Sequence, residues 1–428
     1  MYVSQLQMRG GENPVRNWLT PARIVFYCIA MIVLYVVMMT AWVVTSHGFT
    51  VHTASRPGAD FSIFWSASYA LLHGSAAQVY YHPSFDRIQQ TLFTNLGHVS
   101  MMPWLYPPTF LVLIAPLALL PPLAMYFVFT AGGITLFTAG TLRVSGLVSS
   151  LKGSRFAWLV VAAMPCAFVP AMFGQNSLLT AGIAVFALYW LPRKPVLAGL
   201  CIGLLAIKPQ LALLFPLVLI AARAWRALVA AAFSATLFSA LSVLVCGVQS
   251  LRDFLVNTGI ARETLLEHQR SYWLSSPTTF AALRDSGVPI AASYAAQACV
   301  ALIAATAVWH VWRKSRDMRL RAASFTIATL LANPYVWHYE LAWAGIAIAC
   351  MVALGLDKGW LRGEQSVIAL LWLLPAYELF NRIFSLPQIG PAILLLMLLI
   401  IVRRVRLTGD ERDERAALIY SHAIQTIR

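Results

Sequence analysis

Long apolar runs, separated by short polar segments, occupy the chain from about residue 24 to residue 402. A helix that crosses a bilayer needs about 20 mostly apolar residues, and several runs reach that length. In hydrocarbon the backbone N–H and C=O groups must be bonded within the protein, so the runs are predicted to be helices. Twelve runs are predicted to span the membrane: 24–44, 122–142, 156–172, 177–191, 195–207, 210–222, 227–247, 292–312, 321–335, 341–356, 366–380 and 388–402.

The apolar stretch from Pro107 to Leu120 is ambiguous, because it is short for a bilayer crossing and rich in proline. If it is re-entrant or interfacial, both termini are cytoplasmic and 23 of the 31 Lys and Arg residues lie on the cytoplasmic side. That distribution follows the positive-inside rule. If the stretch crosses and nothing else changes, the later basic loops face outward and break the rule.

A rival topology merges 195–222 into one proline-kinked helix and also lets 107–120 cross. It leaves five basic residues of the segment 143–194 outside, so the twelve-span topology is preferred. This topology predicts one transmembrane domain, residues 1–402, followed by a cytoplasmic tail, residues 403–428. Two long loops are then extracytoplasmic, 45–121 and 249–290.

The composition agrees with a membrane protein, since 60% of the residues are hydrophobic, only 11% are charged and the mean hydropathy is +0.72. Soluble domains carry about 25% charged residues. The net charge of +15 sits in short clusters between apolar runs, where it sets orientation in the membrane, and no nucleic-acid-binding motif is present. Nucleic acid is therefore not an expected partner. The six cysteines fall in or beside apolar runs and are expected to be buried thiols.

The first outer loop contains a candidate catalytic carboxylate, Asp60. Apolar residues recur at helical spacing from Phe61 to Gly74, which predicts an amphipathic helix on the membrane surface that ends at Gly74. Asp60 opens this helix, where an aspartate is typical of an N-cap. A carboxylate at this place can also take a proton from an acceptor hydroxyl. The two roles are compatible.

Two further outer turns carry candidate binding residues. Lys208 interrupts the apolar stretch from Val196 to Ala222, where it either snorkels to the interface or binds a phosphate. Gln175 and Asn176 follow Gly174 between two spans, where they either form an ordinary helix–helix turn or bond a substrate.

Two other polar clusters lie on the predicted outer side. Residues 333–340 combine aromatic side chains, which are typical of a membrane interface, with His338 and Glu340, which are not. In the second outer loop Arg270 can clamp a phosphate or belong to a solvated helix face, and the second interpretation is favoured. No P-loop, GxGxxG, HExxH, GxSxG or CxxC spacing occurs, so nucleotide-dependent and zinc-peptidase mechanisms lack support.

Seven short motifs occur in an order that resembles glycosyltransferase family 87, the polyprenyl-phosphate-mannose-dependent mannosyltransferase-like group of the GT-C superfamily. The resemblance covers about residues 20–355. The motifs are Gly58-Ala59-Asp60-Phe61, Leu72-His73-Gly74, Tyr106-Pro107-Pro108, Gly174-Gln175-Asn176, Ala198-Gly199-Leu200, Lys208-Pro209 and Asn333-Pro334-Tyr335.

The resemblance implies an all-α GT-C-like bundle that moves a hexose, mannose-like, from a polyprenyl-phosphate donor to a glycolipid or glycan acceptor on the extracytoplasmic face. By motif position Asp60 is the expected base of an inverting single displacement. Because the motif holds one acidic residue, no obligatory metal or other cofactor is expected. The expected donor- and acceptor-binding residues are Lys208, Gln175, Asn176, His338, Arg270 and Tyr106.

The competing hypothesis is a polytopic transporter or a lipid or sugar flippase that transfers no sugar. Transporters usually contain internal repeats and ionisable groups near the midplane, whereas here the polar residues gather at the outer ends of the spans. A third possibility is a non-catalytic subunit of an envelope assembly. Outer-face chemistry with both termini in the cytoplasm fits a bacterial inner membrane.

Overall fold

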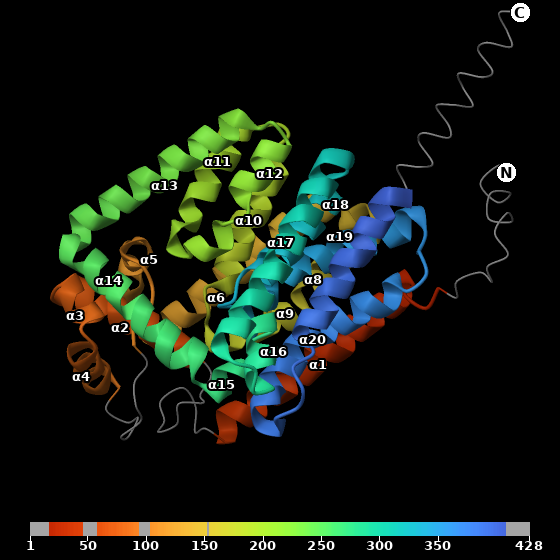
Figure 1. Ribbon diagram of the computed structural model, residues 1–428. Helices are drawn as coiled ribbons and strands as arrows, with labels where there is room; N and C mark the ends of the chain where they lie inside the picture. The colour runs from red at the N-terminus through yellow and green to blue at the C-terminus, as the bar shows by residue number, and fades with distance from the viewer. Residues whose placement is uncertain (1–16, 46–57, 94–102, 152–153, 408–428) are drawn as a thin grey trace, which may run out of the picture.

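The computed structural model describes residues 17–45, 58–93, 103–151 and 154–407, which are 83% helical and contain no strand (Figure 1). The all-α prediction is confirmed. The predicted tail from residue 408 onward, and parts of the first outer loop, lie outside the described residues.

The described residues between 21 and 384 form twenty-five short and long helices. The first part of the chain forms α1 (Pro21–Thr45), α2 (Ala59–His73), α3 (Ala76–Tyr80), α4 (His82–Leu92), α5 (Pro108–Ile114), η3 (Ala115–Leu119), α6 (Pro122–Ser145), α7 (Leu147–Ser150), α8 (Ser154–Ala162), α9 (Pro165–Phe173), α10 (Ser177–Trp190), α11 (Pro195–Leu204), η4 (Leu205–Ile207) and η5 (Pro209–Ala212). The second part forms α12 (Phe215–Ala221), α13 (Trp225–Cys246), α14 (Val248–Ala261), η6 (Arg262–Glu267), α15 (Arg270–Trp273), α16 (Thr279–Asp285), α17 (Ile290–Lys314), α18 (Met318–Ala332), η7 (His338–Leu341), α19 (Ala342–Lys358) and α20 (Glu364–Phe384). Residues 390–407 are also helical.

Each of the twelve predicted spans contains a helix, but only six of the described helices are long and apolar enough to cross a membrane. A seventh crossing is possible if α8 and α9, which meet at 58°, form one bent span. Several other apolar helices are short, because Pro195 and Pro209 begin new segments between residues 190 and 221. At 1.5 Å per residue, the 14 residues of α10 span only about 21 Å, less than the hydrocarbon thickness of about 30 Å.

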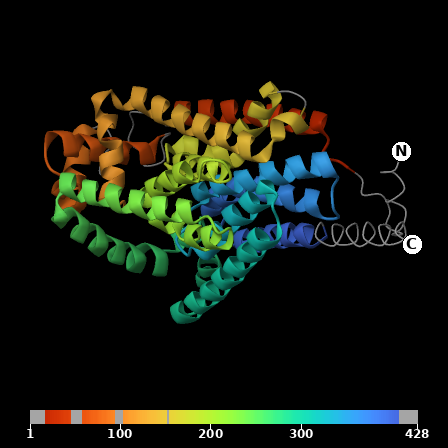
Figure 2. The same cartoon turned by 90° about the horizontal axis from the view of Figure 1, so that it is seen from above.

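The centre of the bundle is formed by η7 and α19. Within an 18-residue apolar stretch of this pair, 89% of the residues are buried, whereas the share is 11% in the corresponding stretches of α1 and α13. Small residues such as Ala344, Gly345 and Ala349 allow neighbouring helices to approach α19 closely. In contrast, α1 lies along one edge of the molecule (Figures 1 and 2). Many of its apolar side chains are exposed.

The helix α2 lies where the sequence predicts a surface helix, but its packing differs. Phe64 packs edge-on against Trp104, Tyr106 and Phe110, with ring centroids 5.0–6.2 Å apart. The Pro107–Leu120 stretch forms α5 and η3, and Trp65 Nε1 donates to the Leu120 carbonyl at 2.9 Å. This stretch therefore covers α2, which explains why α2 is buried on most sides. The helix ends before Gly74 as predicted.

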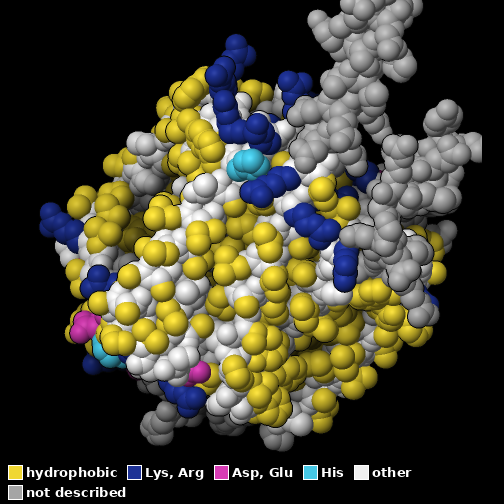
Figure 3. All heavy atoms as spheres, turned by 45° about the vertical axis from the view of Figure 1, so that its right-hand side comes forward, with side chains coloured by type: hydrophobic (Ala, Val, Ile, Leu, Met, Phe, Trp, Pro, Cys, Tyr) yellow, Lys and Arg dark blue, Asp and Glu magenta, His cyan; other side chains and the backbone are white. Residues whose placement is uncertain are grey.

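The predicted cytoplasmic segments meet at one end of the bundle. Ser150 donates to Asp357 at 2.8 Å, and Asp357 pairs with Arg319 at 2.7 Å. These contacts bring together Ser150, Arg319 and Asp357, which belong to three basic segments that the preferred topology places on one side of the membrane. Lys and Arg side chains gather toward the upper end of the face in Figure 3, above a broad hydrophobic surface.

Candidate active site

Asp60 lies in the first turn of α2, and a backbone contact fixes its position. Gly58 precedes the helix with φ 74°, a left-handed conformation that glycine adopts without a Cβ clash, and its N–H donates to the Met172 carbonyl at 2.8 Å. The N-cap is therefore Gly58, and the prediction that Asp60 caps the helix is wrong. The Asp60 carboxylate is directed instead to a neighbouring turn.

That turn is Gly174-Gln175-Asn176, between α9 and α10. Gln175 Nε2 donates to Asp60 Oδ2 at 2.6 Å, while Gln175 Oε1 accepts from the Tyr106 hydroxyl at 3.2 Å. Gly174 has φ 70°, and a Cβ on it would lie 2.5 Å from Phe61 Cβ. Only glycine therefore lets the turn approach α2 closely enough for Gln175 to bond Asp60.

Lys208 occupies the break between η4 and η5, and it is only 5% exposed. Its Nζ donates to Asn176 Oδ1 at 2.9 Å and to Glu340 Oε1 at 2.5 Å. It also lies 5.5 Å from the ring centroids of Tyr106 and Tyr339. Lys208 is thus a buried cation bonded on several sides, and it does not snorkel.

Glu340 has two different partners. One oxygen accepts from Lys208, and the other accepts from the backbone N–H of Trp337 at 2.7 Å, which fixes the start of η7. A continuous polar network consequently runs through Asp60, Gln175, Asn176, Lys208 and Glu340. We call it the outer network, after the side on which the sequence predicts these residues.

The family model of glycosyltransferase family 87 matches residues 104–334, more than half of the 428-residue chain. The chain belongs to glycosyltransferase family 87. Neither the curated proteins nor the solved structures contain a match to it. The matched region includes Gln175, Asn176 and Lys208 of the outer network, and the hydrogen bonds above join Asp60 and Glu340, which lie outside that region, to the same network.

Burial governs the proton affinity of Asp60 in this family 87 chain. Asp60 is half-buried, and the loss of solvent raises the pKa of its carboxyl from the ordinary value of 3.8 to about 6. The Gln175 hydrogen bond and the charges of Lys208 and Arg382 hold this pKa lower than burial alone would. At neutral pH the carboxyl is mostly ionised and is able to accept a proton.

His338, predicted as a binding residue, is buried next to the outer network. Its ring lies edge-on to Phe173 at 5.7 Å, and the adjacent Trp337 and Tyr339 rings are 6.0 and 5.3 Å away. The structure therefore brings His338 to the region of Glu340 without bonding it to the network's described members.

Arg270 does not join the outer network. It pairs with Asp285 at 2.9 Å, and its side chain is 62% exposed. A different cation, Arg382 near the end of α20, reaches the site, since its Cζ lies 5.9 Å from the centroid of the Trp337 ring and its charge acts on Asp60. Sequence reasoning did not select Arg382 as a site residue. Its place in the last predicted outer turn, beside Asn381, is the sequence feature that could have indicated it.

Within the described parts of the chain, no group of three or more His, Cys, Asp or Glu residues is arranged to hold a metal ion. The carboxylates of the outer network already have hydrogen-bond partners in Gln175, Lys208 and the Trp337 backbone.

Proposed function

We propose that this family 87 glycosyltransferase transfers a hexose, mannose-like, from a polyprenyl-phosphate donor to an acceptor hydroxyl on the extracytoplasmic face. The observation that supports this most strongly is the half-buried Asp60 carboxylate, held by Gln175 at one end of the helical bundle. A single positioned carboxylate with a pKa of about 6 suits a general base at neutral pH.

The proposed reaction is one displacement with inversion at the sugar C1. The acceptor oxygen forms a bond to C1 as the bond between C1 and the phosphate oxygen breaks. Asp60 takes the acceptor's hydroxyl proton, and polyprenyl phosphate leaves with the electron pair. Gln175 keeps the carboxylate aimed at the acceptor, because an amide donor bonded to one oxygen leaves the other oxygen for the incoming proton.

Asn176 is the proposed sugar-binding residue. Lys208 can only donate hydrogen bonds, so the Asn176 amide must direct its oxygen to Lys208 and its NH2 group elsewhere. That buried NH2 group has no hydrogen-bond partner among the described residues. Since an unpaired buried donor is costly, a substrate hydroxyl that accepts from it gains both affinity and orientation.

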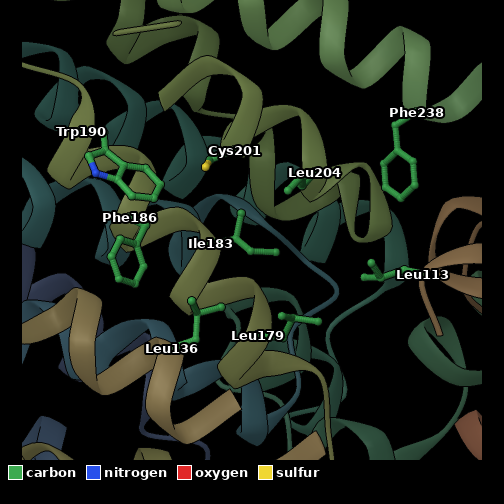
Figure 4. A pocket seen from close by; sticks show the side chains of 9 residues that line it. All are labelled: Leu113, Leu136, Leu179, Ile183, Phe186, Trp190, Cys201, Leu204 and Phe238. Atoms are coloured by element: carbon green, nitrogen blue, oxygen red, sulfur yellow. The ribbon is translucent and has the colours of Figure 1, made fainter. Parts of the chain in front are cut away.

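An apolar cavity of about 330 Å³ supports a lipid-linked donor. It lies between α5, α6, α10, α11 and α13, and only apolar side chains line it (Figure 4). Leu179 lies three residues after Asn176, and Leu204 lies four residues before Lys208, so one side of the cavity is within about one helical turn of the outer network. A hydrocarbon chain bound there would place its phosphate close to Asp60.

The proposed orientation is a bacterial inner membrane with both termini in the cytoplasm. The basic segments meet at the end opposite the outer network, and the positive-inside rule assigns that end to the cytoplasm. We keep the twelve-span bundle as part of this proposal, with short helices and the bent pair of α8 and α9 completing the crossings. A cysteine at the exposed Arg270, which this topology places on the outer side, would then react with an impermeant thiol reagent added from outside, whereas reaction only after permeabilisation would contradict the orientation.

The donor is tested with the purified protein in proteoliposomes, whose membrane separates two compartments. The protein would be incubated with polyprenyl-phosphate mannose, polyprenyl-phosphate glucose and GDP-mannose, each with a labelled sugar, plus a membrane extract as the source of acceptor. We expect label to move to a new glycolipid or glycan from a polyprenyl-phosphate donor and not from GDP-mannose. Movement of the intact donor across the bilayer without a new glycosidic bond would support the flippase hypothesis and contradict this function.

A further inference from the structure

The proposed reaction needs a cation that the outer network does not supply. When the bond to C1 breaks, a phosphodiester with one negative charge becomes a phosphomonoester that carries up to two. Preorganised positive charge where charge develops is a large contribution to catalysis. The network holds the Asp60 carboxylate and the Lys208–Glu340 ion pair, whose two charges compensate each other. Its net charge therefore repels a phosphate.

Three of the four arginines of the second outer loop have other partners. Arg270 pairs with Asp285 at 2.9 Å, and Arg262 lies 3.5 Å from Glu267. Arg284 donates to two backbone carbonyls and stacks on Trp273. None of these arginines contacts a residue of the outer network within the described ranges.

Arg382 differs from these arginines in its surroundings. It lies in the last turn of α20, it is exposed, and it makes no ion pair with any residue in the described parts of the chain. The Trp337 ring supports its guanidinium at 5.9 Å, and the Trp337 backbone is bonded to Glu340 of the outer network. A cation held over a ring keeps its N–H groups in the guanidinium plane free to bond an anion.

The surroundings of Arg382 contain few competing acids. Glu378, one turn earlier on α20, is buried and accepts from Gln388 at 2.8 Å, and Glu340 is already bonded to Lys208. The charge of Arg382 also acts on Asp60, which has no ion-pair partner among the described residues.

We propose that Arg382 binds the phosphate of the lipid-linked donor and stabilises the charge that forms on it as the sugar leaves. The proposal rests on the proposed function and assigns the phosphate to a residue outside the matched region 104–334. A planar guanidinium bonds two phosphate oxygens at once, which a lysine at this position would not do.

The binding test uses purified protein in nanodiscs of zwitterionic lipid with farnesyl phosphate as the probe, farnesol as the uncharged analogue and inorganic phosphate as the tailless one. For Arg382→Gln we expect the Kd for farnesyl phosphate to rise at least about tenfold, the usual scale for losing one charge-assisted contact of about 1.4 kcal/mol or more. Farnesol binding should not change, and Arg382→Lys should fall between. Arg270→Gln, another exposed arginine of the outer side, is the matched control and should bind as the wild type does.

Unchanged binding of farnesyl phosphate to Arg382→Gln would overturn the proposal. So would an Arg382-dependent response to nanodiscs of phosphatidylglycerol with no such response to farnesyl phosphate, since Arg382 would then bind an anionic membrane lipid. Asp60→Asn separates the two hypotheses, because, with one negative charge fewer, it should bind farnesyl phosphate at least as tightly as the wild type while sugar transfer falls sharply. If no donor supports transfer but farnesyl phosphate binding depends on Arg382, the phosphate site stands and the proposed function fails.

Discussion

At each end of the bundle a buried glutamate binds a cation and a backbone N–H, but the surroundings of the two glutamates differ. At one end Glu364 pairs with Arg404 and accepts from the N–H of Leu361; at the other Glu340 pairs with Lys208 and accepts from the N–H of Trp337. Each glutamate thus bonds the backbone three residues earlier and a cation far along the chain. Both pairs are buried.

The difference lies in what each pair holds in place. Beside Glu364, the Gln365 side chain accepts from the backbone N–H groups of Trp18 and Leu19, so that end closes the bundle with satisfied bonds. Beside Lys208, the bonded Asn176 leaves an unpaired NH2 group, and Asp60 lacks an ion-pair partner among the described residues. The comparison teaches that a buried ion pair alone does not mark a site; the unsatisfied groups next to it do.

The largest expected effect on stability comes from breaking either pair. Lys208→Met and Arg404→Met should each lower the free energy of unfolding by about 3–5 kcal/mol, because a carboxylate is left buried without its cation. Changing the partner as well, in Lys208→Met/Glu340→Gln and Arg404→Met/Glu364→Gln, should restore much of the loss. Thermal unfolding in detergent measures both.

Activity per folded molecule should then separate the two ends. The Arg404→Met/Glu364→Gln protein should keep near-normal sugar transfer, whereas Lys208→Met/Glu340→Gln should not, since Asn176 has lost the donor that orients it. Equal activity in the two double variants would remove the functional distinction between the ends.

A smaller effect is expected from glycines in left-handed conformations at the two ends. Gly174→Ala adds strain at φ 70° and places a Cβ 2.5 Å from Phe61 Cβ, so we expect a loss of about 2–4 kcal/mol and a marked fall in transfer. Gly146→Ala has nearly the same φ, 68°, but its Cβ would meet only Ser149 Oγ at 3.9 Å, so only about 1–2 kcal/mol should be lost and transfer should continue. Similar results for both variants would show that the contact between Gly174 and α2 is unimportant.

The smallest expected effect is a shift in pH dependence. With a pKa of about 6, Asp60 is protonated below that pH and cannot act as a base, so kcat/KM should rise with pH through about 6. Because burial raises this pKa, Asp60 favours the folded state below pH 3.8, and this contribution is lost as the pH rises through about 6. Arg382→Gln should move the acid limb of the rate profile to higher pH, since Arg382 lowers the Asp60 pKa; Arg270→Gln should leave it in place. If the acid limb of the rate profile stays at the same pH in Arg382→Gln, the charge interaction between Arg382 and Asp60 is contradicted.

The sequence predicts the helices and their grouping well, because apolar runs and basic loops are local patterns. The break at Lys208-Pro209 and the shared location of Asp60, Gln175 and Lys208 both appear in the structure. The features that the sequence does not predict depend on contacts between residues far apart in the chain. The pairing of Lys208 with Glu340 joins residues 132 positions apart, and no local pattern distinguishes a paired lysine from a phosphate ligand.

The cap at Asp60 illustrates a second kind of failure. An aspartate at a helix start is typical of an N-cap, but Gly58 bonds the Met172 carbonyl and starts the helix itself, which turns the carboxylate toward Gln175. Arg270 and Arg382 are equally basic in the sequence, and only the fold pairs the first with Asp285 and brings the second beside Trp337.

The central claim is that Asp60 is the base for sugar transfer, and single-turnover transfer by Asp60→Asn tests it most directly. Asparagine preserves the size of the side chain and can still accept from Gln175, so folding and donor binding should persist while the rate falls by about 10²–10⁴-fold. Asp86→Asn, a change of the same kind in α4 where the carboxylate bonds Gln90, should transfer at the wild-type rate. A folded Asp60→Asn protein that transfers sugar as fast as the Asp86→Asn protein would contradict the account.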